Sequence, residues 1–309
     1  MIPRLRGATR TARHALAAIV VTALVAGACS DDASDDASDG AEPQVEGATS
    51  SSADATVDGP EDLDAPDDPD QAAETLTRVE RALRAPETAA DEVPRLGWEQ
   101  QHAYRALAVH PEWVPEVLDA VPDDVAPVVD ANATAVREIG GLAEPQPGLP
   151  EWRIETPPPP EVLLGFYREA EAASGIPWPY LAAIHLVETR VGRIRGTSTA
   201  GAQGPMQFIP PTWEAYGEGD VADNRDAILA AGRYLDARGG PDDMDAALYA
   251  YNPSDRYVRT IQAYAGVIRA SELAYRGYYH WQVYYATADG VMLLPEGYPD
   301  EGAVEADLG

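Results

Sequence analysis

The chain has 309 residues, of which 45% are hydrophobic, and its 52 acidic residues against 22 basic ones give a formal net charge of −30. This excess of negative charge argues against nucleic acid as a partner, because proteins bind the phosphate backbone through basic residues. The single cysteine excludes internal disulfides and clusters of thiolate metal ligands.

The N-terminus has the layout of a secretory signal. Several arginines precede an apolar run over residues 15–26, which is too short to span a membrane. The run leads into Ala26-Gly27-Ala28-Cys29, which resembles the lipobox of bacterial lipoproteins. We therefore expect residues 1–28 to be a lipoprotein signal peptide and Cys29 to carry a lipid anchor at the outer face of a bacterial membrane, in the cell envelope. A plain signal peptide with an incidental thiol is the alternative.

Residues 29–70 form an acidic segment that we expect to be disordered. From Ser30 to Asp70 there are 15 acidic residues and no basic one, and large apolar side chains are almost absent. Such a composition cannot bury enough surface to fold. As a flexible tether of this length it would reach on the order of 35 Å from the membrane.

Residues 71–144 have a helical pattern. Leu76, Val79 and Leu83 follow at spacings of three and four, and Pro86 ends that helix. Further helices are expected at residues 98–109, 111–120 and 123–139. We interpret the segment as a small helical module that packs against a neighbour or acts as a spacer. Residues 145–160, which end in four prolines, are expected to be a stiff linker to the next domain.

Residues 161–275 are predicted to form one compact domain of short helices. The expected helices cover residues 161–174, 178–190, 221–238, 244–251 and 256–272. Residues 276–309 differ, because Tyr279, Trp281, Val283 and Tyr285 alternate as in a strand and Asp289-Gly290 can turn into a second strand. The sequence therefore predicts a mainly α protein with a short C-terminal β-hairpin.

Glu188 is an acidic residue on a helix face that otherwise points into the core. Leu181 and Ile184 precede it by seven and four residues and share that face. Burial and the negative end of the helix dipole both raise the pKa of a carboxyl, which makes it a candidate general acid near neutral pH. The alternative is a structural glutamate that is paired with an arginine downstream: Arg190, Arg193 or Arg195.

The segment Ser198-Thr-Ala-Gly-Ala-Gln-Gly-Pro-Met-Gln207 and the later Ala250-Tyr251-Asn252 make the catalytic interpretation more specific. With Glu188 in front of them, they resemble the signature of lytic transglycosylases and goose-type lysozymes, over about 110 residues. In that family a glutamate ends a helix and the two segments follow in this order. The resemblance implies a lysozyme-like helical domain with Glu188 as the catalytic residue.

Five other positions are expected to bind substrate. By resemblance, Ser198 and Gln207 orient the saccharide, and Tyr251 lies against Glu188 or the bond that is cut. Gln207 and Asn252 offer amides for hydrogen bonds to a sugar, while Met206 and Tyr251 offer soft, flat contact surface. The chain departs from the family pattern by Thr189 after the glutamate, by Pro205 in the middle segment and by Pro253-Ser254 after the asparagine.

The resemblance implies cleavage of the β-1,4 bond between N-acetylmuramic acid and N-acetylglucosamine in peptidoglycan. One carboxyl can suffice, because the C6 hydroxyl of the muramoyl sugar can replace water and give a 1,6-anhydro end. A hydrolytic lysozyme would need a second carboxylate, for which Glu214, Asp220 and Asp223 are candidates. A wall-binding lipoprotein without catalytic activity is a third possibility.

We expect no cofactor and no metal site. His185 and Glu188 have the i, i+3 spacing of a metal pair, but no further histidine stands where a zinc-protease helix requires one. His185 is therefore expected to be a packing residue. The expected partners are peptidoglycan glycan strands and, through the lipid anchor, a membrane, and the chain is expected to be a monomer.

Overall fold

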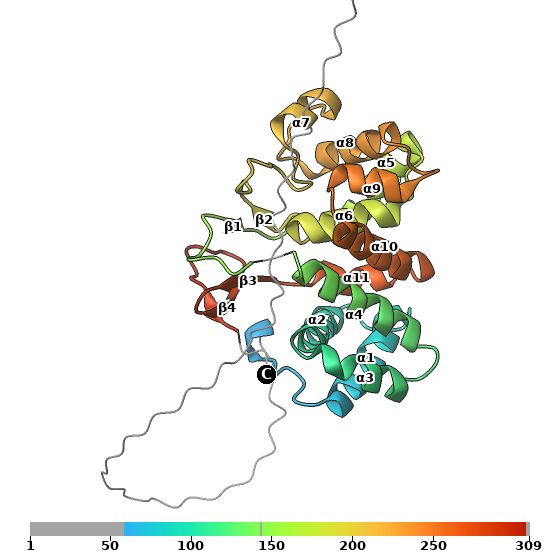
Figure 1. Cartoon of the computed structure of the whole chain (residues 1–309), viewed down its shortest axis with the longest axis vertical. Coiled ribbons are helices and arrows are strands. Elements are labelled where there is room, and N and C mark those ends of the chain that lie inside the picture. The colour runs from blue at the N-terminus through green and yellow to red at the C-terminus, as the bar shows by residue number, and fades with distance from the viewer. Residues whose placement is uncertain (1–58, 143, 307–309) are drawn as a thin grey trace, which may run out of the picture.

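The structure is a computed structural model that describes residues 59–142 and 144–306 (Figure 1). The predicted signal peptide, the lipid attachment at Cys29 and most of the acidic tether lie outside these residues. Within the described ranges, no helix is long and apolar enough to cross a membrane. The last part of the predicted tether is described, and it holds a short 3-10 helix, η1 (Pro60–Asp62), and the beginning of the first α-helix.

The first half of the described chain is helical, as the periodicity predicts. Asp68 caps its first helix by accepting a hydrogen bond from the backbone amide of Gln71 at 2.8 Å. The elements are α1 (Pro69–Arg84), α2 (Val93–Val109), the 3-10 helix η2 (Pro111–Trp113), α3 (Val114–Ala120) and α4 (Ala126–Gly140).

The second half continues with short helices. Gly175 ends α5 with a φ of 75°, the left-handed conformation that glycine tolerates best. The elements are α5 (Pro160–Ser174), α6 (Trp178–Thr189), α7 (Pro210–Tyr216), α8 (Asn224–Ala237), α9 (Met244–Tyr251), α10 (Asp255–Ala270) and α11 (Ala274–Tyr279). The sequence pattern did not predict α7 or α11.

The predicted C-terminal hairpin is present, with one change at its start. Strands β3 (Val283–Thr287) and β4 (Gly290–Leu294) pair antiparallel, and β5 (Val304–Glu305) adds a third strand at the edge of β4. The expected alternation from Tyr279 was wrong at its beginning, because Tyr279 ends α11 and Trp281 lies in the turn that follows. The mainly helical fold class with a C-terminal hairpin is confirmed.

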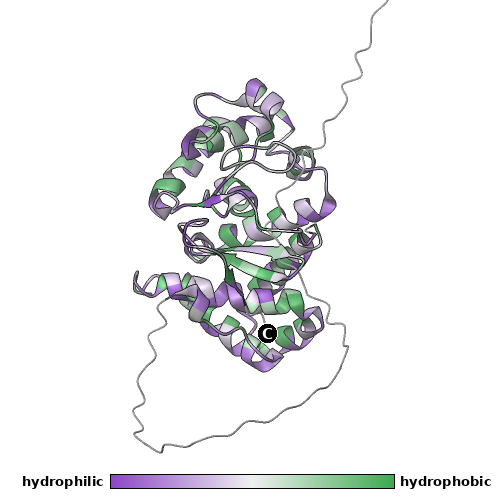
Figure 2. Cartoon of the chain, turned by 90° about the vertical axis from the view of Figure 1, so that its left-hand side faces the viewer, coloured by the Kyte–Doolittle hydropathy of each residue, from purple (hydrophilic) through white to green (hydrophobic). Residues whose placement is uncertain are grey.

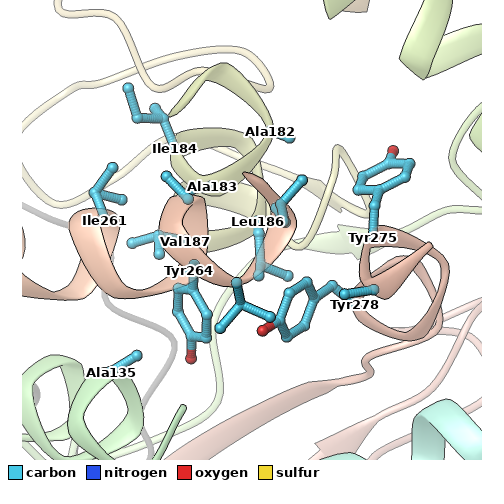
Figure 3. Close-up of a cluster of buried hydrophobic side chains, with 14 of the residues drawn as sticks. Ala135, Ala182, Ala183, Ile184, Leu186, Val187, Ile261, Tyr264, Tyr275 and Tyr278 are labelled. Carbon is cyan, nitrogen blue, oxygen red and sulfur yellow. The ribbon is translucent and has the colours of Figure 1, made fainter. Parts of the chain in front are cut away.

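One continuous hydrophobic core joins the two halves. It contains buried side chains from α1, α2 and α4 together with those of α5, α6, α8, α10 and α11. Helix α10 packs against α4 on one side and α6 on another. Figure 3 shows this part of the core, where Ala135 of α4, Val187 of α6 and Ile261 of α10 belong to the same cluster. The residues predicted as a helical module therefore share their core with the helix that bears Glu188.

The proline-rich segment 145–160 is packed against the body. Its strand β1 (Arg153–Ile154) pairs with β2 (Ile194–Arg195), which follows α6. Trp152 and Ile154 are buried in a second, smaller cluster with Val283 and Leu294. Figure 2 looks onto this side of the molecule and shows apolar residues in the strands. The segment thus holds the C-terminal sheet beside the end of α6.

Candidate active site

Helix α6 places Glu188 at its C-terminal end, inside the protein. All residues of α6 are buried, in keeping with a helix that is apolar all around. The helix stops abruptly, because Arg190 and Val191 have φ values of 52° and 56°. In the described chain the only other non-glycine residue with positive φ is Gln207, at 51°. Such strained residues gather at functional sites, and here Arg190 and Val191 directly follow the helix of Glu188 while Gln207 ends the middle segment.

The surroundings of the Glu188 side chain shift its carboxyl towards the protonated form. It is 4% exposed, and its Oε1 accepts a hydrogen bond from the Tyr257 hydroxyl at 2.7 Å. Burial raises the pKa of Glu188 to about 7, although the Tyr257 hydrogen bond acts in the opposite direction. A carboxyl with this pKa can donate a proton near neutral pH and accept it back.

The alternative of a structural ion pair does not apply to Glu188. Among the described residues no arginine or histidine nitrogen lies within 4.0 Å of its carboxyl, since it forms none of the salt bridges found there. Arg190 donates to the Leu186 carbonyl, and Arg193 to the Tyr279 carbonyl. Arg195 lies 3.4 Å from a Glu155 oxygen. The three candidate partners are directed elsewhere.

The middle segment is tied to the end of α6 through its backbone. Thr189 donates from its hydroxyl to the Pro205 carbonyl at 2.6 Å. The Ser198 hydroxyl accepts hydrogen bonds from the amides of Ala200 and Ala202, at 3.3 and 2.9 Å. Ser198 is buried, so in this structure it shapes the loop, and a direct contact of its hydroxyl with a saccharide would need the loop to open.

Gln207 is the member of this segment with unused hydrogen-bonding capacity. Its Nε2 donates to the Gly204 carbonyl at 2.9 Å, while its Oε1 is buried without a partner in the described chain. Met206 is 0% exposed, which does not fit the expected contact of its side chain with a sugar. Its backbone carbonyl instead accepts a hydrogen bond from the Tyr251 hydroxyl at 2.6 Å.

Tyr251 and Asn252 lie at the end of α9, next to the middle segment. The rings of Tyr251 and Tyr257 are stacked with their centroids 6.4 Å apart, and in the described chain only Tyr257 of the two forms a hydrogen bond with Glu188. Asn252 is 5% exposed. Its backbone carbonyl accepts from the Ser254 amide, which leads the chain into α10.

A groove lies beside this group, between α7, α8 and α9. It has a volume of about 1320 Å³, and Tyr216, Tyr234 and Tyr249 are among its lining residues. A smaller cavity of about 60 Å³, lined by Gln207 and Tyr251, shares four lining residues with the groove. Glu188 lines neither space, and the ring pair of Tyr251 and Tyr257 connects the small cavity to its carboxyl. The groove thus lies beside the residues that surround Glu188, and Tyr251 and Tyr257 stand between it and the carboxyl.

The candidates for a second carboxylate lie on the surface. Glu214, Asp220 and Asp223 are exposed. Asp223 caps α8 by accepting from the Asp226 amide, and Asp220 accepts from the Ala222 amide. No carboxylate is among the groups that shift the pKa of Glu188. Asp220 and Asp223 are thus engaged in local turn and cap hydrogen bonds.

His185 lies in the core, one turn before Glu188. It is 0% exposed, and its Nδ1 is 2.8 Å from the Tyr167 hydroxyl. Burial, together with the charge of Arg195, lowers the pKa of His185 to about 3, so the ring is neutral. Within the described residues, no group of three or more His, Cys, Asp or Glu side chains is arranged to hold a metal ion.

Tyr257 is the residue of this site that sequence reasoning missed. It starts the buried stripe of α10, which continues with Ile261 and Tyr264 at helical spacing. A buried tyrosine hydroxyl needs a hydrogen-bond partner, so a tyrosine at the first turn of a buried stripe is a usable signal. The pairing with α6 is a tertiary contact, however, and the pattern of one helix does not reveal it.

The comparisons with known proteins give one partial relationship. The chain is similar to a protein named membrane-bound lytic murein transglycosylase F from Thiobacillus denitrificans (strain ATCC 25259 / T1), with 37% identity over 94 residues, 28% of this chain. Those residues cover 20% of that protein, so the chain spans about one-fifth of the length of the curated relative it matches. No protein-family model and no solved structure matches the chain. The similarity supports a relationship to the lytic transglycosylases.

Proposed function

We propose that this protein is a peptidoglycan lytic transglycosylase in which Glu188 acts first as a general acid and then as a general base. The observation that carries the proposal is the state of the Glu188 carboxyl: it is buried, free of an arginine partner in the described chain, and bound to the Tyr257 hydroxyl with a pKa of about 7. The partial similarity to a lytic murein transglycosylase points to the same substrate class.

In the proposed reaction Glu188 protonates the glycosidic oxygen between N-acetylmuramic acid and N-acetylglucosamine. The bond to C1 breaks and an oxocarbenium-like sugar forms. The C6 hydroxyl of the same muramoyl residue then attacks C1 and gives its proton to the Glu188 carboxylate, which restores the acid. The Tyr257 hydrogen bond stabilises the carboxylate between the two steps. Gln207, Tyr251 and Asn252 are proposed to hold the sugar, with the groove as the path of the strand.

The exposed positions of Glu214, Asp220 and Asp223 favour this reaction over hydrolysis, which needs a second carboxylate to activate water. The proposed location is the cell envelope, with Cys29 as the lipid attachment, which fits a substrate in the bacterial wall.

The test is incubation of purified sacculi with the protein, followed by mass spectrometry of the released muropeptides. We expect 1,6-anhydro ends, and we expect Glu188→Gln to lower the rate of release by at least about 10²-fold, as for loss of a general acid and base. Release of muropeptides with reducing ends would contradict the transglycosylase proposal and indicate a hydrolase instead. Equal release by the variant would contradict the catalytic role of Glu188, and no release by either protein would leave a wall-binding protein as the better account.

A further inference from the structure

Helix α10 connects the proposed acid to the N-terminal helices. It packs against α6 on one side and against α4 on another. Tyr257, in its first turns, donates the hydrogen bond to Glu188. In Figure 3, Ala135 of α4 lies near the residues of α6 and α10 that form this part of the core. A shift of α10 relative to α4 and α6 would therefore move the Tyr257 hydroxyl relative to Glu188.

A single carboxyl of α4, that of Glu138, fastens the beginning of α10. Its Oε2 accepts a hydrogen bond from Nη2 of Arg259 at 2.8 Å and lies 3.7 Å from Nη1 of Arg256. These two arginines flank Tyr257 in the sequence. The Glu138 side chain is 11% exposed, whereas those of Arg256 and Arg259 are about half exposed, at 46% and 52%. The carboxylate that α4 contributes is thus nearly buried, whereas the two guanidinium groups that α10 contributes are half exposed.

Two further contacts fit α4 to the same turn of α10. The Arg256 guanidinium covers Gly141, the C-cap of α4, so closely that a Cβ at this position would collide with it. An arginine there also complements the negative end of the α4 dipole. The Thr260 hydroxyl lies 3.5 Å from the Ala135 carbonyl. The polar contacts between the helices therefore concentrate at the end of α10 that bears Tyr257.

We propose that Glu138 is a positioning residue for Glu188: it holds the first turns of α10 and thereby keeps the Tyr257 hydroxyl on the Glu188 carboxyl. The inference deepens the proposed function and rests on it for its catalytic consequence. It assigns a role to the residues predicted as a helical module, which would complete the catalytic site although they touch no substrate.

The proposal predicts the direction in which the pKa of Glu188 changes when Glu138 is substituted. The titratable groups that face Glu188 in the described chain are Tyr257 of α10 and Tyr251 of α9. The Tyr257 hydrogen bond favours the ionised carboxyl and lowers the pKa of Glu188. If Glu138→Gln lets α10 move, this hydrogen bond weakens and the pKa of Glu188 rises. A loss of stability elsewhere in the fold would not produce this shift.

The experiment follows the Glu188 carboxyl itself, by ¹³C NMR of the full chain labelled in its glutamate side chains, with Glu188→Gln to assign the signal. Glu138→Gln and Tyr257→Phe should each raise the pKa of Glu188, and Glu138→Gln should add nothing in a Tyr257→Phe background. Glu169→Gln, which removes an ion pair between α5 and α8 with Arg225, is the matched control and should leave the titration unchanged. If Glu138→Gln does not fold, Arg259→Gln breaks the shorter contact and leaves Glu138 paired with Arg256 and Arg137.

The proposal is overturned if the Glu188 titration of the Glu138 variant matches that of the parent chain, or if its shift adds fully to that of Tyr257→Phe. On sacculi we expect Glu138→Gln to lower kcat by about 3- to 10-fold with KM nearly unchanged. A parent chain that is inactive on sacculi but shows the NMR shifts would refute the proposed function while leaving the positioning of Glu188 by Glu138 intact.

Discussion

At the scale of single residues, Glu188 shows how a proposed catalytic group affects stability. Its pKa is about 7 in the folded protein, against 4.5 for an exposed glutamate side chain. Between these values the folded protein binds more protons than the unfolded chain, so the free energy of unfolding falls as the pH rises. The stabilisation of the fold that comes from the raised pKa of Glu188 is fully present below about pH 4.5 and is lost as the pH rises through about 7.

Glu188→Gln should therefore stabilise the protein at alkaline pH, because glutamine stays neutral and can still accept the Tyr257 hydrogen bond. We expect the variant to exceed the parent chain in free energy of unfolding by on the order of 3 kcal/mol at pH 8 and to equal it at pH 4. Urea unfolding at both pH values measures this. A constant difference across the range would show that Glu188 titrates normally.

Substitution of Tyr251 should affect substrate binding more than it affects the pKa of Glu188. Its hydroxyl bonds to the Met206 carbonyl and so holds the loop that carries Gln207, whereas the hydroxyl of Tyr257 bonds to Glu188. For Tyr251→Phe we expect a higher KM on solubilised glycan strands and an unchanged pH dependence of kcat/KM. Tyr257→Phe should instead move the alkaline limb of that profile to higher pH. Equal profiles for the two variants would contradict this division of roles.

At the scale of elements, two glycines separate the effects of packing and of helix propensity. A Cβ at Gly97 of α2 would lie 2.7 Å from the Gly277 carbonyl oxygen of α11, which is closer than real contacts allow. Gly165, in α5, has open space around it and is exposed. The first glycine lets two helices approach, and the second serves no packing purpose.

Gly97→Ala should destabilise the protein by about 1–3 kcal/mol, because α2 and α11 must separate. Gly165→Ala, the same chemical change, should stabilise it by about 0.5–1 kcal/mol through helix propensity. Chemical unfolding of the two variants beside the parent chain provides the comparison. If Gly97→Ala is neutral, the close approach of α2 and α11 is not required by the fold.

The elements also show what could be predicted from the sequence. The sequence pattern predicted α9 with the bounds that the structure shows, 244–251, because its apolar stripe and its ends are local features. Tyr279 and Trp281 were wrongly predicted as strand, since aromatic alternation in a buried helix end and turn looks like a strand. Glu188 could be identified from the sequence by its helix face and the neighbouring motifs, and its catalytic role stays a prediction. Its contact with Tyr257 depends on how α10 packs on α6, which no single segment encodes.

At the scale of the whole molecule, the sequence suggested two bodies joined by a linker at residues 145–160, but the core runs through both. Polar contacts inside this core also cross between the halves. Tyr278 donates to the Asn132 side chain at 2.5 Å, and the Trp281 indole donates to Gln100 at 3.0 Å. Removing one half would leave these buried groups without partners, in addition to exposing apolar surface.

A fragment of residues 145–309 should therefore fail to fold cooperatively, although it contains all the residues proposed to act on substrate. For the full chain we expect the urea transitions followed by far-ultraviolet circular dichroism and by tryptophan fluorescence to coincide, as in one cooperative unit. For the fragment we expect a broad transition and poor protection of amide hydrogens. A fragment that unfolds in one sharp step would mean that α4 is not needed to hold α10. It would then weaken the case that Glu138 and the N-terminal helices complete the site around Glu188, because that case depends on α4 bracing the turn that carries Tyr257.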